Sequence, residues 1–348
     1  MNPPHLTRPL AAAAVLAVLP AQGDVTVLPP VPDAIGFAGA AAGVHDGHLL
    51  AGGGANFPDG VMPWDGGKKV WHDRLFALDL RQPGAAWKEI GKLPAPNGYG
   101  VSLTLAEGVL LVGGGDAKEN FRTVRLLSLV DGRPVYRELP SLPVPLAQMA
   151  GALVGRSVHV VGGIEAPDAS TASAVHWMLD LDAQDKGWQT QPALPAAGRI
   201  LATAAGIDGV FVIAGGCSLA PDVAGKPVRT YLREAWKFAE GRWTRLADLP
   251  RAAVAAASPA PVRGDVLFVV SGDDGTQAGS PTKHHGFSRQ ILRFDLSMNA
   301  WEDAGELNAP APVTLPTAPW RDGFILFNGE VKPGVRTPQV LLFTPPAP

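Results

Sequence analysis

A short segment near the C-terminus brings three charged side chains of different chemistry close together. Glu330, Lys332 and Arg336 occur in the sequence NGEVKPGVRT, around a Pro-Gly turn. A carboxylate held beside cations can act as a general base, and a guanidinium can bind a carboxylate through two parallel N–H donors. We interpret Glu330 as a candidate base, Arg336 as a candidate carboxylate clamp and Lys332 as a second positive group. The alternative is a surface carboxylate paired with Lys332.

Two further Arg-Thr pairs resemble the pair that begins at Arg336. They begin at Arg122 and Arg229, each ahead of an apolar or aromatic run. One interpretation is that arginine supports the architecture at this point of a repeat. The other is that several guanidinium groups surround one opening, where together they would attract an anion. Both interpretations stay open at the level of the sequence.

Other side chains in the long loops suit a sugar ligand. Asn56 and Phe57 follow a glycine run, Trp64 lies in the same loop, and Tyr99 follows a Pro-Asn-Gly segment. Amide groups can hydrogen-bond to hydroxyls and aromatic rings can stack on sugar faces, although each residue could equally serve loop packing. His72 precedes an aspartate, so it is either a proton-transfer group or half of a structural His-Asp pair.

The sequence offers little basis for a metal or a redox cofactor. His284 and His285 are adjacent, and on an extended chain adjacent side chains point in opposite directions. Cys217 is the only cysteine, which excludes an intrachain disulfide and a cysteine-based zinc site. With only three tyrosines, it is also a poor basis for a Cys-Tyr copper cofactor. We expect no metal and no cofactor.

The elements that must position these residues recur six times. Each is an apolar strand that ends in glycine or another small residue. The six copies are LLAGGG ending at Gly54, LLVGGG at Gly115, VHVVGG at Gly163, VFVIAGG at Gly216, LFVVSG at Gly272 and ILFNG at Gly329. Repetition at this spacing is typical of β-propellers, and the hydrophobic run, glycine pair and downstream tryptophan resemble the kelch repeat.

The second signature of the repeat predicts how the ring closes. An aromatic residue followed by a stop such as Leu-Pro occurs after five of the six glycine strands, at Trp87, Tyr136, Trp188, Trp243 and Trp301. The N-terminal segment VTVLPPVP (25–32) has no preceding glycine strand, and VLLF (340–343) has no following aromatic strand. We therefore predict an all-β, six-bladed kelch-type propeller whose last blade is completed by the N-terminal strand.

Composition places limits on location and partners. The net charge is −3 without a Lys/Arg run, so no global field would attract nucleic acid or an acidic membrane. Residues 1–23 have basic residues, a short apolar run and small residues, the pattern of a secretory signal peptide. We expect a signal peptide over 1–23, one propeller domain over 24–348, and export to the periplasm or the extracellular space, with no membrane association after cleavage.

Loop length indicates which face carries the function. The turns between the first and second strands of each unit are short, for example His45-Asp46-Gly47. The segments after each glycine pair are long and chemically varied, and long loops on a rigid scaffold are the usual place for binding and catalysis. The site should therefore lie at the mouth of the central channel on that face.

Several segments resemble one family. NGEVKPGVRT, GGGANFPDG and NGYGVSL are similar to motifs of the kelch-type N-acetylneuraminate epimerases, or sialic acid mutarotases. The order is circularly permuted, as in the cyclically permuted branch, because NGE lies here in the last repeat. The resemblance implies that Glu330 accepts a proton, that Arg336 binds the substrate carboxylate, and that a small anionic sugar changes anomer without a cofactor. Lys332 or His72 would supply the second proton.

Two other functions compete with this interpretation. A non-catalytic kelch module that binds a glycan or a protein would leave the charged NGE loop without a role. A sialidase is disfavoured, because SGDDGTQAG (271–279) lacks the Ser-x-Asp-x-Gly-x-Thr-Trp pattern.

Overall fold

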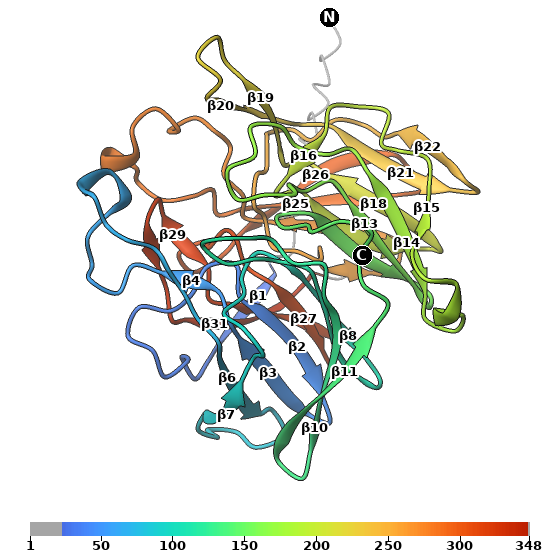
Figure 1. The fold of residues 1–348 in the computed structure, drawn as a ribbon. Helices are drawn as coiled ribbons and strands as arrows, with labels where there is room; N and C mark the ends of the chain where they lie inside the picture. Colours follow the sequence, from blue (N-terminus) through green and yellow to red (C-terminus); the bar gives the residue numbers. More distant parts are fainter. Residues whose placement is uncertain (1–22, 347–348) are drawn as a thin grey trace, which may run out of the picture.

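The computed structural model describes residues 23–346, and they form six four-stranded antiparallel sheets (Figure 1). The expected signal peptide lies outside the described residues, apart from Gly23. Blade 1 consists of β2 (Ala41–His45), β3 (His48–Gly52), β6 (Arg74–Asp79) and β7 (Lys88–Lys92). Blade 2 consists of β8 (Val101–Leu105), β9 (Gly108–Val112), β10 (Val124–Val130) and β11 (Arg133–Leu139). Blade 3 consists of β12 (Ala150–Val154), β13 (Ser157–Val161), β14 (His176–Asp180) and β15 (Gln189–Thr190). Blade 4 consists of β17 (Thr203–Ile207), β18 (Val210–Ala214), β21 (Ala235–Ala239) and β22 (Arg242–Arg245). Blade 5 consists of β23 (Val262–Arg263), β24 (Val266–Val270), β25 (Gln290–Asp295) and β26 (Ala300–Glu306). Blade 6 consists of β27 (Thr317–Trp320), β28 (Gly323–Phe327), β31 (Val340–Thr344) and β1 (Asp24–Leu28).

The loops carry the remaining elements. Three small sheets join β4 (Ala55–Asn56) to β5 (Val70–Trp71), β16 (Arg199–Ile200) to β19 (Cys217–Pro221) and β20 (Pro227–Tyr231), and β29 (Glu330–Lys332) to β30 (Val335–Arg336). Three single 3-10 turns are η1 (Pro63–Asp65), η2 (Gln184–Lys186) and η3 (Pro281–Lys283). The β19–β20 hairpin projects at the top of Figure 1. Within residues 23–346 no helix is long and apolar enough to cross a membrane.

Ring closure by the N-terminal strand is confirmed. β1 pairs antiparallel with β31 from Val25 opposite Phe343 to Leu28 opposite Val340. The blue strands of blade 1 therefore lie beside the red strands of blade 6 in Figure 1. Because β1 covers the outer edge of β31, the last blade has the same four strands as the others.

Apolar side chains fill each of the six junctions between neighbouring blades. One buried cluster spans each junction. At the junction between blades 6 and 1, for example, Leu49 and Phe76 of blade 1 pack with Ile325 and Phe327 of blade 6. The core is therefore a ring of packed interfaces between sheets, which explains why the strands carry so many Val, Leu, Ile and Phe residues.

The repeated aromatic residues link each of five blades to the preceding one. The indole N–H of Trp87, Trp188, Trp243 and Trp301 donates to a carbonyl of the preceding blade at 2.8 Å, and the Tyr136 hydroxyl does the same at 2.9 Å. These side chains combine apolar packing with a satisfied polar tip. All five therefore serve the packing between blades.

A closed circle of backbone hydrogen bonds surrounds the central channel. Each of six residues, one per blade, donates its N–H to the carbonyl of the equivalent residue in a neighbouring blade, at 2.7–2.9 Å. The six are Gly39, Tyr99, Gln148, Leu201, Ala255 and Thr314, and all have positive φ. Five of these are not glycine, so the ring holds strained backbone in place and makes a rigid platform.

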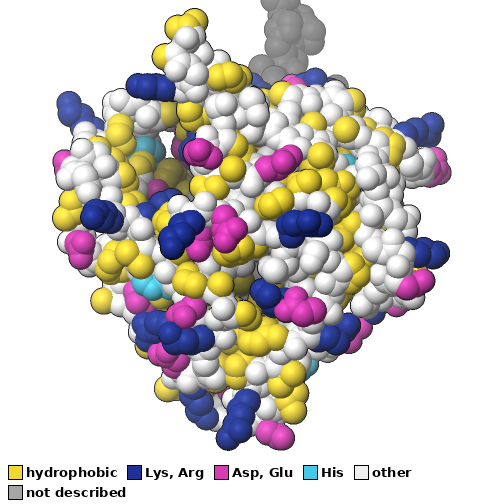
Figure 2. Space-filling model, in the orientation of Figure 1, with side chains coloured by type: hydrophobic (Ala, Val, Ile, Leu, Met, Phe, Trp, Pro, Cys, Tyr) yellow, Lys and Arg dark blue, Asp and Glu magenta, His cyan; other side chains and the backbone are white. Residues whose placement is uncertain are grey.

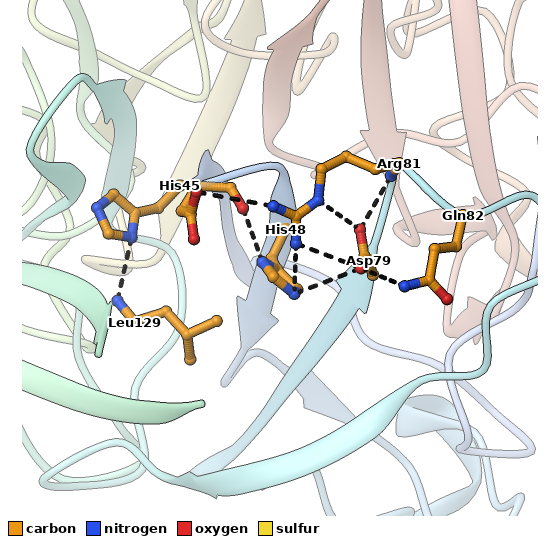
Figure 3. A network of polar contacts seen from close by, with 7 residues as sticks. His45, His48, Asp79, Arg81, Gln82 and Leu129 are labelled. Atoms are coloured by element: carbon orange, nitrogen blue, oxygen red, sulfur yellow. Dashed lines mark hydrogen bonds and ion pairs between the residues drawn. The ribbon is translucent and has the colours of Figure 1, made fainter. Parts of the chain in front are cut away.

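The opposite end of blade 1 carries a polar network that is far from this ring along the strands (Figure 3). Arg81 binds Asp79 at 2.9 Å, and His45 Nδ1 accepts the N–H of Leu129 in blade 2 at 3.1 Å. Hydrogen bonding from Arg81 lowers the pKa of Asp79 to about 2. These contacts hold the short turns in place on the face opposite the long loops.

Candidate active site

A cavity of about 680 Å³ opens over the backbone ring, on the face with the long loops. Its floor includes the ring residues Tyr99, Gln148, Leu201 and Thr314. The loops after β3, β9, β13, β18 and β28 supply its walls. A volume of this size is typical of a small-molecule site. The visible face in Figure 2 is hollowed and mixes charges of both signs, without a broad patch of one sign.

Glu330 and Arg336 both line this cavity and face each other. Arg336 Nη1 lies 2.7 Å from Glu330 Oε2, and Glu330 Oε1 accepts the backbone N–H of Gly334 at 2.8 Å. The β29–β30 turn produces this arrangement because it pairs Glu330 directly with Arg336. The carboxylate is thus held by one backbone N–H donor and one ion pair, and the Glu330 side chain remains 18% exposed, so a ligand in the cavity can reach it.

Arg336 is fixed on three sides, yet one of its nitrogens lacks an aligned acceptor. Its side chain is 4% exposed, Nε donates to the Ala55 carbonyl at 3.3 Å, and Cζ lies 5.0 Å from the centre of the Phe57 ring. The contact of Nη1 with Glu330 is an ion pair without hydrogen-bond alignment, and Nη1 has no hydrogen-bond partner among the described residues. A buried, unsatisfied donor at a cavity wall suits an incoming oxygen ligand.

The loop between β4 and β5 lines one wall of the cavity. It begins at Phe57 beside Arg336, and its η1 turn packs on the NGE loop. Gly334 has φ +79°, which favours glycine, and a Cβ added there would lie 2.7 Å from Met62 Sδ and 3.3 Å from Pro63 Cδ, so Met62 would have to move. The loop ends at Lys69, and Trp71 of β5 lines the cavity near blade 2.

Lys69 is a charged cavity residue that the sequence did not single out. Its Nζ lies 4.9 Å from the centre of the Trp71 ring and 5.0 Å from that of Tyr99, and it donates to the Tyr99 hydroxyl at 3.4 Å. It has no carboxylate within 4.0 Å among the described residues. Asp116, Asn120 and Gln148 also line the cavity, and no sequence pattern distinguished them from loop residues.

The sequence-predicted residues divide into two groups. Glu330, Arg336, Phe57, Tyr99 and Arg229 line the cavity, as does Trp64, which was proposed with them. Lys332 lies outside that lining: it is exposed and borders a separate cavity of about 530 Å³ with His285 and Arg289.

His72 and Asn56 bind each other beneath the loops and do not line the mouth cavity. His72 Nε2 lies 2.8 Å from Asn56 Oδ1, and Asn56 Nδ2 donates to the Gly36 carbonyl at 3.1 Å. Burial lowers the pKa of His72, opposed in part by the charge of Asp33. This is an oriented structural contact, although with Asn56 as the partner of His72 where Asp73 was expected.

Arg122 has an architectural contact. Its Nε donates to the Leu142 carbonyl at 2.8 Å, and Arg233 and Arg289 make the same contact with Leu249 and Leu307. Arg122 therefore corresponds to Arg233 and Arg289 and not to Arg336, so the Arg-Thr pairs do not mark one repeated position.

Acidic and imidazole groups do not gather into a metal site in this part of the chain. Within residues 23–346 no group of three or more His, Cys, Asp or Glu side chains is placed to hold an ion. Burial raises the pKa of the Cys217 thiol to about 11.

The fold and the cavity together define a six-bladed kelch-type β-propeller with a charged pocket at the mouth of its channel. The solved structure of YjhT matches it with a TM-score of 0.66, covering 90% of this chain and 96% of that one at 15% identity. Residues 24–135 match the family model described as N-acetylneuraminate epimerase. The resemblance to that family, inferred from motifs, is thereby confirmed over this part of the chain.

Curated relatives match a similarly short stretch. The N-acetylneuraminate epimerase of Salmonella enteritidis PT4 is 39% identical over 102 residues, which cover 26% of each chain. The enzyme of Yersinia pestis Pestoides F is 37% identical over 110 residues, or 27% of each chain. The alignments thus span about a quarter of these relatives. The family-model match covers Phe57, Lys69 and Tyr99 but ends before Glu330 and Arg336.

Proposed function

We propose that this protein is a mutarotase that interconverts the anomers of N-acetylneuraminate or a related 2-keto sugar acid. The observation that carries the proposal is the Glu330–Arg336 pair, which faces a cavity of sufficient size for a sugar. The partial match to relatives named N-acetylneuraminate epimerase supports the same substrate class. On the pattern of residues 1–23 we further propose export to the periplasm or the extracellular space.

Arg336 binds the substrate carboxylate in this proposal. Its Nη1 has no aligned acceptor, and its Nε and aromatic contacts keep the guanidinium in place while Nη1 exchanges partners. In a 2-keto sugar acid the carboxylate is attached to the anomeric carbon. A carboxylate on Arg336 therefore brings the anomeric hydroxyl close to Glu330, which is already 2.7 Å from the same guanidinium.

Glu330 then acts as the proton-transfer group. Its carboxylate removes the proton from the anomeric hydroxyl, a carbonyl forms, and the bond from the anomeric carbon to the ring oxygen breaks. The ring oxygen gains a proton. Because both oxygens are attached to the same carbon, protonated Glu330 can return the proton to the ring oxygen. Rotation of the open chain and the reverse steps give the other anomer, and neither Lys332 nor His72 is required.

Proton NMR tests the reaction directly. We expect the protein to accelerate anomer equilibration of freshly dissolved crystalline N-acetylneuraminate, and we expect Glu330→Gln to reduce the catalysed rate by at least about 100-fold, the usual contribution of a general base. Glu240→Gln is the matched control, since Glu240 is an exposed carboxylate paired with Arg242 in blade 4. Undiminished rates in Glu330→Gln would remove this residue from the mechanism. Ligand binding without acceleration by the wild type would indicate a non-catalytic propeller.

A further inference from the structure

We propose that Lys69, Trp71 and Tyr99 form a second subsite in the mouth cavity, which binds the polyhydroxylated arm of the sugar acid. All three residues line the cavity. The inference rests on the proposed function, because it assigns the part of the substrate that lies away from the carboxylate. It adds Lys69 and Trp71, which belong neither to the motif segments nor to the Glu330–Arg336 pair, and it gives Tyr99 a defined role.

Rigid backbone positions the two aromatic rings. Tyr99 belongs to the hydrogen-bonded ring, where its N–H donates to the Gly39 carbonyl at 2.7 Å and its own carbonyl accepts from Gln148 at 2.7 Å. Trp71 is paired with Ala55 in the β4–β5 sheet. The rings come from blades 1 and 2, and the Lys69 ammonium lies about equally far from both, at 4.9 and 5.0 Å. The subsite is therefore preformed on its aromatic side.

The ammonium group has donors to spare. Lys69 Nζ carries three N–H donors and makes one long contact of 3.4 Å to the Tyr99 hydroxyl. The two rings favour a cation at this place. Hydroxyl oxygens can accept the remaining N–H groups, and the ring faces can contact the C–H groups between them. A chain of adjacent hydroxyl-bearing carbons offers both kinds of contact.

The position in the cavity agrees with the shape of a sugar acid. Arg336 Nε contacts the Ala55 carbonyl of β4, and Ala55 is paired with Trp71 of β5, so the carboxylate site and the aromatic subsite are neighbours across this hairpin. In N-acetylneuraminate the carbon that bears the carboxylate and the carbon that bears the three-carbon hydroxylated arm likewise lie close together, because both are bonded to the ring oxygen. One molecule can therefore occupy both subsites in a cavity of about 680 Å³.

Two ligands separate this subsite from a general attraction for anions. The first is N-acetylneuraminate, and the second is a shorter 2-keto-3-deoxy sugar acid that keeps the carboxylate and anomeric centre but lacks the three-carbon arm. For Lys69→Met we expect the calorimetric Kd of N-acetylneuraminate to rise by about 10-fold or more, the loss of a charged hydrogen bond, while the Kd of the shorter acid stays within about twofold.

Lys68→Met is the matched control. Lys68 precedes Lys69 and is exposed, but it does not line the cavity. It should leave both Kd values unchanged. Tyr99→Phe, which keeps the ring and removes the hydroxyl, should weaken only N-acetylneuraminate, by a few-fold, and thermal unfolding would verify that each variant is folded.

The outcomes decide between the proposals. Equal weakening of both acids by Lys69→Met would mean that Lys69 only attracts anions, and unchanged binding of both would remove it from the site. Either result overturns the subsite and leaves the mutarotase proposal standing. If the wild type binds neither acid, the subsite and the proposed function both fail.

Discussion

Acidification should destabilise the fold through one buried histidine pair. His159 Nδ1 lies 2.9 Å from His176 Nε2 at the junction of blades 3 and 4, among the rings of Phe211, Phe238 and Trp243. Burial lowers the pKa of His159 to about 4, and burial together with the neighbouring His159 lowers that of His176 to about 3. Both imidazoles are therefore neutral in the folded protein over most of the acidic range.

The pKa differences set the size of the effect. In the unfolded chain both histidines would bind a proton as the pH falls through about 6.5, whereas in the fold they bind one only near their lowered pKa values. Stability is thus fully present above about pH 6.5 and falls below it. At about 1.4 kcal/mol per pH unit and per proton, each histidine costs about 2 kcal/mol between pH 8 and pH 5, and the pair costs about 4 kcal/mol.

Urea unfolding measured across this pH range checks the prediction. We expect the unfolding free energy of the wild type to fall by about 4 kcal/mol from pH 8 to pH 5, beyond a background set by other groups. His159→Gln should remove about half of this loss, whatever its effect at pH 8, and His159→Gln with His176→Gln should remove all of it. His285→Gln, an exposed histidine, is the control. An unchanged pH dependence in the double variant, or imidazole NMR signals that titrate near pH 6.5 in the folded protein, would refute the reasoning.

Two further changes test the loop and the ring closure. Gly334→Ala should abolish the proposed mutarotase activity and cost about 1–2 kcal/mol of stability, because alanine is strained at φ +79°, its methyl group meets Met62, and the backbone N–H of residue 334 holds Glu330. Gly225→Ala, at φ +78° in open space, is the control in the NMR assay. Full activity in Gly334→Ala would contradict the role of this turn. A variant truncated to begin after Leu28 lacks β1 and exposes the edge of β31. We expect this variant to self-associate, which light scattering would detect. A monodisperse monomer of unchanged stability would show that closure does not need β1.

The fold was predictable because each blade must satisfy the same requirements. A glycine strand, an aromatic strand and short turns recur, and two incomplete ends can only complete each other. The register of Val25 opposite Phe343 confirms that inference. The recurring pattern of buried residues determines the strands and turns of each blade, so these can be inferred without knowledge of the loops.

Loop residues were less predictable because loop lengths differ between blades. The Arg-Thr pairs at Arg122 and Arg336 look alike in sequence. Their backbone hydrogen bonds place them two positions apart: the Arg122 carbonyl accepts from Leu142, whereas the matching acceptor in the last blade belongs to Pro338. The register shift between Glu330 and Lys332 similarly separates two charges that the sequence places together. Lys69 reaches the cavity only because its loop folds back to blade 2.

The symmetry of the ring also explains how one arginine can serve both the scaffold and the site. Asn120 of blade 2 occupies the position of Arg336, and its amide donates to the Ile164 carbonyl of blade 3 at 2.9 Å. Arg336 makes the equivalent contact through Nε, to the Ala55 carbonyl of the next blade around the ring. Asparagine makes that contact with the amide nitrogen at the end of its side chain, whereas arginine makes it with Nε and keeps its two terminal nitrogens. One of them lies beside Glu330, so the longer side chain adds chemistry to a position that already links neighbouring blades in blades 2 and 6.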